Sequence, residues 1–249
     1  MFNATVSWHD ILFMLRGAGV TLMLTFWSVL GGTVLGTVFG VLRASAPGWP
    51  SAALGALLDV FRSIPLLIQI ILANALAPMV GLDISAFAVA CVVLAIYGAA
   101  YCTEIVRAGV LAVPQATRRA ARSLGMSWWD DLTAIVFPIA LRVGLPAWIG
   151  LALGLMKDSS LVLWIGVIEL LRSSQIVVTR TQQPLLVLAI AGAIYFAINF
   201  PIARAGSWLD VSSQTLMAHS YRVIRRMRYG TDSTRERHND GGGPSSDTT

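Results

Sequence analysis

The residues of this chain that could do chemistry are a few ionisable side chains set within long apolar runs. Asp59, Arg62, Glu104, Lys157 and Asp158 all interrupt or end such a run. Ionisable groups at membrane depth are costly, and they usually face the interior of a helix bundle or a water-filled path. The sequence therefore indicates a polar path between helices.

The common catalytic and nucleotide-binding motifs do not occur in the sequence. The histidines His9, His219 and His238 lie outside the apolar runs, and there is no His-Glu-x-x-His or Gly-x-Ser-x-Gly pattern. Lys157 is the only lysine, and its neighbour Asp158 excludes a phosphate-binding Gly-x-x-x-x-Gly-Lys-Ser/Thr loop. We therefore predict that the chain is not an enzyme and holds no metal or cofactor.

Composition places the chain among membrane proteins. Apolar residues make up 56% of it and charged residues 12%, whereas an ordinary soluble domain has about 25% charged residues. The mean hydropathy of +0.71 agrees with this class. Gly32, Gly36 and Gly40 repeat on one face of the first apolar run, which predicts that another helix packs closely there.

Five segments are apolar enough to cross a bilayer core, which needs about 20 helical residues. They comprise residues 17–42, 51–82, 84–103, 142–168 and 181–203. Asp59, Arg62 and Pro65 interrupt the second, and the fourth crosses only if Lys157 and Asp158 are tolerated inside it. Asp59 and Arg62, three residues apart, are expected to face each other on a helix. The predicted fold class is an all-α, polytopic transmembrane bundle of about five spans.

The distribution of arginines orients these spans, because cytoplasmic loops carry an excess of basic residues. If residues 104–138 lie inside, the inside set comprises Arg43, Arg107, Arg118, Arg119, Arg122, Arg142, Arg204, Arg222, Arg225, Arg226 and Arg228. Outside remain Arg16, Arg62, Arg172 and Arg180. We therefore predict that the N-terminus lies outside and the C-terminus inside. Glu169, Arg172 and Arg180 are interpreted as part of an external loop.

Residues 104–138 are too charged to cross lipid, and their pattern predicts two short helices joined by a corner. Pro114 suits a helix start, and good helix formers follow it up to Gly125, which favours the left-handed conformation that ends a helix. Ser127 and Asp130 have the spacing of a capping box for a second helix. Pro138 is expected to stop or bend that helix.

This segment also resembles a known family. Ala120-Ala121, Gly125, Ile135 and Phe137-Pro138, at their spacings, are similar to the cytoplasmic EAA loop of ATP-binding-cassette (ABC) importer permeases. Residues 61–69, 101–114 and 157–161 resemble the polar-amino-acid branch of that family, and the agreement runs from about residue 19 to residue 209. Two departures stand out: Arg119 replaces the acidic residue of the loop, and Ala116-Thr117 replaces a Gly-Gln pair.

The resemblance implies a multi-pass permease subunit in the bacterial inner membrane that translocates a polar amino acid or close analogue. Its implied partners are an ABC ATPase dimer that hydrolyses ATP, a second permease subunit (identical or homologous), an extracytoplasmic binding protein and the bilayer, with no nucleic acid. The residues that match the ATPase-coupling pattern are Arg118, Arg119, Ala120, Ala121, Gly125 and Pro138.

Other candidate residues are assigned from the sequence pattern itself. Glu104 and Arg107 are expected to anchor the root of the coupling loop. The candidates for the translocation path are Lys157, Asp158, Ser159, Ser160 and Arg62. For Lys157 and Asp158, a buried ion pair with other helices that fixes packing is an equal alternative, and for Arg62 the alternative is a pair with Asp59.

A different class of protein, a self-contained ion-coupled carrier, also deserves weight. Such carriers usually contain inverted repeats, and no second copy of the 101–138 pattern occurs in this chain. We divide the chain into a transmembrane permease domain, residues 1–210, and a basic, disordered cytoplasmic tail, residues 211–249.

Overall fold

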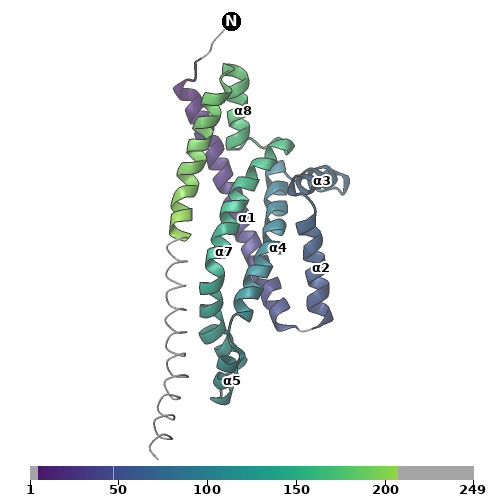
Figure 1. Cartoon of the computed structure of the whole chain (residues 1–249). Coiled ribbons are helices and arrows are strands. Elements are labelled where there is room, and N and C mark those ends of the chain that lie inside the picture. Colours follow the sequence, from purple (N-terminus) through teal and green to yellow (C-terminus); the bar gives the residue numbers. More distant parts are fainter. Residues whose placement is uncertain (1–4, 47, 207–249) are drawn as a thin grey trace, which may run out of the picture. The chain divides into compact units, whose positions relative to one another are not determined.

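A long first helix, α1 (Trp8–Ser45), packs along α4 (Ala86–Leu111) in the computed structural model, which describes residues 5–46 and 48–206 (Figure 1). A methyl group on Gly36 would lie 2.5 Å from Cβ of Cys102, and one on Gly40 would lie 2.6 Å from Cβ of Val106. Glycines at these positions therefore let the two backbones approach closely. The predicted packing role of this glycine face is confirmed.

The second apolar segment is a pair of helices bent by 94° at a break of two residues. α2 (Trp49–Ser63) ends before Pro65, whose ring disfavours helical geometry in the preceding residue, and α3 (Leu66–Met79) begins after it. The side-chain amide of Gln69 donates to the carbonyls of Phe61 and Ile64, at 2.7 and 2.8 Å. It thereby satisfies carbonyls that the end of α2 leaves without helical partners.

The two short helices predicted after residue 114 are present, and the second continues much further than expected. α5 (Gln115–Ser123) is followed by Gly125 with φ of +83°, and Ser127 and Asp130 form the predicted capping box of α6 (Trp128–Asp130). The chain then passes without a break through the π-helix η1 (Asp131–Val136) into α7 (Phe137–Asp158) and the 3-10 helix η2 (Ser159–Ile165).

Of the two outcomes expected at Pro138, a stop or a bend, the stop is wrong, because the helix continues through it. Proline has no N–H and its ring crowds the carbonyl four residues before it, which breaks an ordinary α-helix. Here the wider turn of η1 immediately precedes Phe137-Pro138, and Pro138 occupies the first turn of α7. The π-helical turn accommodates the proline, so the coupling segment and the fourth span form one helical rod.

The external loop expected around Glu169 is a helix, α8 (Leu170–Thr181). The Glu169 carboxylate accepts hydrogen bonds from the backbone N–H groups of Leu171 and Arg172, at 2.8 and 2.7 Å, and so caps the helix. Polar residues that suggested a loop supply this cap and the exposed face of α8. A final helix, Pro184–Gly206, completes the bundle.

Four helices are long and apolar enough to cross a membrane, and a fifth span results if the bent pair α2 and α3 is counted as one. No strand occurs within residues 5–46 and 48–206. The predicted all-α bundle of about five spans is confirmed. The tail predicted for residues 211–249 lies outside the described residues.

The orientation of the spans stays a prediction with a direct test. A reporter that is active only in the cytoplasm is expected to be active when fused after Gly125 and silent when fused after Thr179, because arginines concentrate on the Gly125 side. The opposite pattern of activity would reverse the assigned orientation.

Candidate functional site: a polar path and a coupling knob

Polar side chains follow one face of α4, which is otherwise an apolar helix. Tyr97, Tyr101 and Glu104 are spaced by four and three residues, so they project on the same side. The Tyr97 hydroxyl donates to the Tyr101 hydroxyl at 3.2 Å, and all three side chains are half-buried. We call these three residues the polar face of α4.

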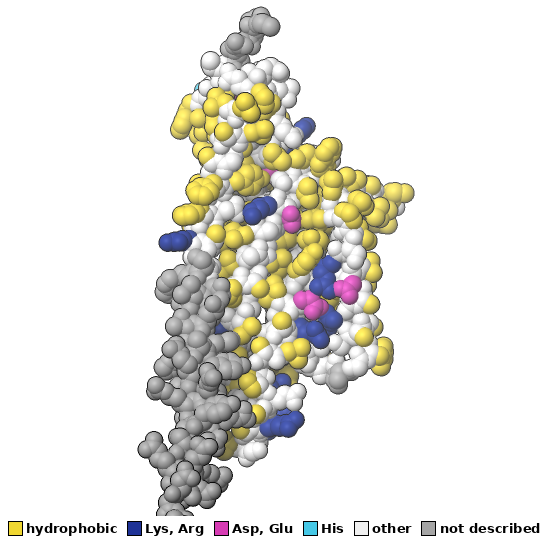
Figure 2. All heavy atoms as spheres, viewed as in Figure 1, with side chains coloured by type: hydrophobic (Ala, Val, Ile, Leu, Met, Phe, Trp, Pro, Cys, Tyr) yellow, Lys and Arg dark blue, Asp and Glu magenta, His cyan; other side chains and the backbone are white. Residues whose placement is uncertain are grey.

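An ion cluster continues this face where α1, α2 and α4 meet. It consists of Arg43, Asp59, Arg62, Glu104 and Arg107. Glu104 pairs with Arg43 and lies 3.7 Å from Arg62 and 3.6 Å from Arg107, while Arg62 pairs with Asp59. Figure 2 shows basic and acidic side chains gathered beside α2 and α4, with hydrophobic side chains over much of the surrounding face.

Glu104 and Arg107 lie together as expected, but Glu104 also contacts arginines of α1 and α2. Its partner Arg43 comes from the end of α1, and the Arg43 Nε–H also donates to the Ser51 carbonyl of α2 at 3.2 Å. The Arg62 guanidinium lies 5.9 Å from the Tyr101 ring centre, close enough for a cation–π contact. Three helices are therefore joined at one carboxylate.

Lys157 and Asp158 lie at the end of α7, and no ion pair joins either of them to another helix within the described part of the chain. Asp158 is half-buried and close enough to the polar face of α4 to interact electrostatically with Tyr97. The Ser160 hydroxyl donates to the Lys157 carbonyl at 2.7 Å. Ser159 is fully buried, and its hydroxyl donates to the Met156 carbonyl at 2.7 Å, so it belongs to the packing.

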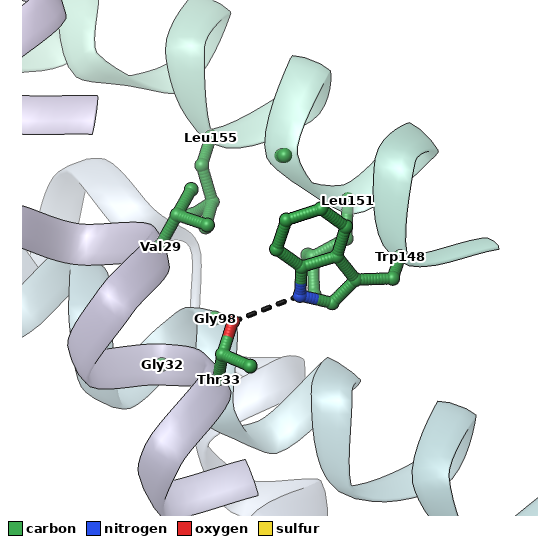
Figure 3. A pocket seen from close by; sticks show the side chains of 8 residues that line it. Val29, Gly32, Thr33, Gly98, Trp148, Leu151 and Leu155 are labelled. Carbon is green, nitrogen blue, oxygen red and sulfur yellow. Dashed lines mark hydrogen bonds between the residues drawn. The ribbon is translucent and has the colours of Figure 1, made fainter. Parts of the chain in front are cut away.

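α7 packs tightly against α1 and α4 around Trp148. The Trp148 indole N–H donates to the Thr33 hydroxyl at 2.8 Å, and Leu151 and Leu155 extend the contact toward α1 and α4 (Figure 3). The small gap that these residues enclose has no room for a water molecule. This part of the contact between α1, α4 and α7 is therefore dry.

The coupling knob, residues 114–137, presents two different faces of α5. Arg119 is exposed and donates to the Gln115 side chain at 3.2 Å, whereas Ala121 is buried. Arg118 turns toward the π-helix, where its Nη2 lies 2.8 Å from Oδ2 of the buried Asp131. Of the arginines expected to contact the ATPase, Arg119 is thus free to do so, and Arg118 is engaged within the knob.

Glu169 is another buried carboxylate, and it is distant in sequence from both the polar face of α4 and the coupling knob. The Tyr195 hydroxyl of the last helix donates to it at 3.3 Å, in addition to the two backbone N–H groups at the start of α8. Burial raises the pKa of the Glu169 carboxyl above its usual value, and these hydrogen bonds oppose the rise. We interpret Glu169 as a structural tie between α8 and the last helix.

Sequence reasoning missed Arg43, Tyr97, Tyr101 and Asp131. The two tyrosines had a usable signal, because their spacing from Glu104 repeats every three to four residues. Arg43 is 61 residues from Glu104 in sequence, and nothing local marks it among the other arginines as the partner. Asp131 follows Asp130 directly, and only the start of the helix decides which of the two is buried.

Comparison with known proteins identifies this arrangement. The family described as "binding-protein-dependent transport system inner membrane component" matches residues 14–212. The probable amino-acid ABC transporter permease YckA of Bacillus subtilis is 30% identical over 80% of this chain and 88% of its own length. The octopine transport system permease OccM of Rhizobium meliloti is 32% identical over 85% of this chain and 90% of its own length.

Solved structures share the fold. One, described as an amino acid ABC transporter with histidines, has a TM-score of 0.73 and 29% identity, and the match covers 84% of this chain and 99% of that one. The inward-facing MetNI methionine ABC transporter matches with a TM-score of 0.71 at 22% identity over 84% of this chain and 99% of that chain, which supports the fold alone.

The fold and the family match define a multi-pass membrane protein of the transporter class. The chain belongs to the family of binding-protein-dependent transport system inner membrane components, and it is a permease subunit of an ABC importer. Membership implies an ATPase and a binding protein as separate subunits, and the permease itself is not an enzyme. The alternative of a self-contained carrier is set aside.

Proposed function

We propose that this permease translocates a polar amino acid or a close analogue along the polar face of α4. The observation that carries the proposal is the line of half-buried polar groups on α4, with Arg62 and Asp158 beside it from α2 and α7. A zwitterionic cargo needs both charge signs along its route, and ionisable groups are retained at membrane depth mainly where they serve such a path. The names of the relatives YckA and OccM, which concern amino-acid and octopine transport, support this class of cargo.

The test is uptake by the reconstituted complex. The permease, its ATPase and its binding protein in proteoliposomes should accumulate at least one labelled polar amino acid in an ATP-dependent manner. An apolar amino acid such as leucine serves as the control substrate. Uptake of none of the polar amino acids or their analogues, with ATP hydrolysis still stimulated by the binding protein, would remove the proposed cargo.

We further propose that the ATPase docks on the exposed face of α5. Gln115, Arg119 and Arg122 are all exposed there, and they leave this face basic where the family pattern has an acidic residue. Like charges on neighbouring turns repel mildly, so an external anionic surface would stabilise them. The groove of the ATPase that receives α5 is therefore expected to be acidic at this point.

Arg119→Glu is accordingly expected to weaken ATPase association by about 2–5 kcal/mol, the usual cost of breaking one side of a desolvated charge pair. Retention of the ATPase during purification of the complex measures the effect. Arg142→Glu, the same charge change at an exposed position on α7, is the matched control and should leave retention unchanged. Tighter ATPase binding by Arg119→Glu would mean that the groove is basic.

A further inference from the structure

Asp131 lies at the junction between the coupling knob and the fourth span, and it is completely buried. One of its oxygens, Oδ2, receives two contacts from Arg118, with Nε at 2.9 Å and Nη2 at 2.8 Å. The other oxygen, Oδ1, has no hydrogen-bond partner within the described residues. Arg118 is therefore the only charged partner of this buried carboxylate in the described part of the chain.

The ion pair joins two elements that the chain otherwise connects by a corner at Gly125. Arg118 belongs to α5, which is only nine residues long, and Asp131 is the first residue of η1. A nine-residue helix is too short to be stable alone in water, so its position depends on contacts such as this one. The pair fixes the angle between α5 and the rod formed by α6, η1 and α7.

The same rod carries Asp158 at its other end. From Asp131 to Asp158 the helix advances through 27 residues, about 40 Å at 1.5 Å per residue. Between these ends α7 touches α4 backbone to backbone, because a methyl group on Gly109 would lie 2.8 Å from the Ala140 carbonyl oxygen. Because the helix is continuous, a tilt at the knob is transmitted along the rod toward Asp158.

We infer that Arg118 and Asp131 are positioning residues that pin α5 to the α7 rod, so that ATPase movement reaches Asp158 through α7. Arg118 then acts inside the permease, and the exposed residues of α5 contact the ATPase. This inference rests on the proposed docking of the ATPase on α5. It predicts that loss of the pair leaves ATP hydrolysis running but no longer controlled by the binding protein.

A double-mutant cycle tests this role. In the reconstituted complex, the measured quantity is the ratio of ATP hydrolysis with the loaded binding protein to hydrolysis without it. Arg118→Gln and Asp131→Asn are each expected to lower this ratio by at least about fivefold, and the double variant should be no worse than either single one. Basal hydrolysis and the amount of ATPase that co-purifies should stay within about twofold, because the outer face of α5 is unchanged.

Two variants guard against a purely structural effect. Arg118→Lys keeps a cation beside Asp131, so it should assemble normally and retain at least about half of the unmodified ratio. Arg142→Gln removes an exposed arginine from the same rod and should change nothing. A ratio for Arg118→Lys as low as that for Arg118→Gln would overturn the inference, because the charge on Asp131 would then be irrelevant.

The remaining outcomes separate the inference from the proposal beneath it. If the two single reductions multiplied in the double variant, Arg118 and Asp131 would act independently of each other, and the proposed pairing of α5 with the α7 rod would be overturned. Loss of the ATPase from Arg118→Gln but not from Asp131→Asn would also overturn it, because Arg118 would then be a docking residue. Failure of Arg119→Glu to affect ATPase association, with the cycle still non-additive, would contradict the docking face and leave the pin standing.

Discussion

Asp158→Asn is expected to reduce transport at least about tenfold while the complex assembles in normal yield. A hydrogen bond to a charged group contributes about 1.5–3 kcal/mol, so loss of one such contact with cargo in transit slows transport by roughly ten- to a hundredfold. The substitution preserves size, and Asp158 is half-buried with no ion pair to another helix in the described residues. No charged partner in that part of the chain is therefore stranded by the change, and folding should tolerate it.

Initial rates of ATP-dependent uptake in proteoliposomes measure this effect, and the yield of purified complex measures assembly. Asp83→Asn is the matched control, because Asp83 is an exposed aspartate in the turn between α3 and α4 and should transport normally after substitution. A collapse of yield together with transport would mean that Asp158 fixes packing. Normal transport would remove Asp158 from the path altogether.

The transmembrane spans were predictable because the bilayer imposes a simple rule on sequence. A helix that crosses lipid must be apolar over about 20 residues, and where a proline such as Pro65 breaks it the freed backbone groups must find other partners. Gln69 supplies those partners, and the break falls where the sequence placed it. The corner at Gly125 and the cap at Ser127 were predictable for the same reason, since each depends on local backbone chemistry.

A helix stop at Pro138, one of two outcomes expected there, and a loop around Glu169 did not form, because distant or unusual geometry overrode a local rule. Pro138 normally limits a helix, but the preceding π-helical turn absorbs it and the helix continues. Glu169 was interpreted as a loop residue because of its charge, yet it is buried and caps α8 with help from Tyr195, 26 residues later. No short window of sequence reveals a partner at that distance.

The candidate site was predicted in part, and here too the contacts that were missed join residues far apart in sequence. Asp59 with Arg62 and Glu104 with Arg107 are each three residues apart, so helical spacing alone brings them together. The central contact of the cluster, Arg43 with Glu104, depends on how α1 packs on α4. Helix packing also directs Arg118 toward Asp131 and leaves Arg119 exposed. Because the two arginines are adjacent in the sequence, the sequence alone does not tell which one pairs with Asp131.

Gly125→Val is expected to uncouple the complex, with binding-protein-stimulated hydrolysis and transport both reduced by about tenfold or more. Gly125 has φ of +83°, and the hydrogen bond from the Met126 N–H to the Ala121 carbonyl, at 3.2 Å, closes the end of α5 around it. A residue with a Cβ pays about 1–2 kcal/mol in the left-handed region, and a β-branched one resists it further. No other atom lies within 4 Å of the position where that Cβ would be, so the strain comes from the backbone alone.

The open space around Gly125 allows a closely matched control. Gly81 has φ of +78° and equal free space around it, but it ends α3, far along the chain from the coupling knob. Gly81→Val should therefore impose a similar strain and leave the stimulation of ATP hydrolysis intact, and Gly125→Asn should keep most of the activity because asparagine tolerates the left-handed region. Since a valine at 125 re-aims α5 against the α7 rod, its damage should be specific to coupling. Full stimulation in Gly125→Val would mean that the corner does not transmit the movement, and equal loss in both valine variants would mean that strain anywhere in the bundle is enough.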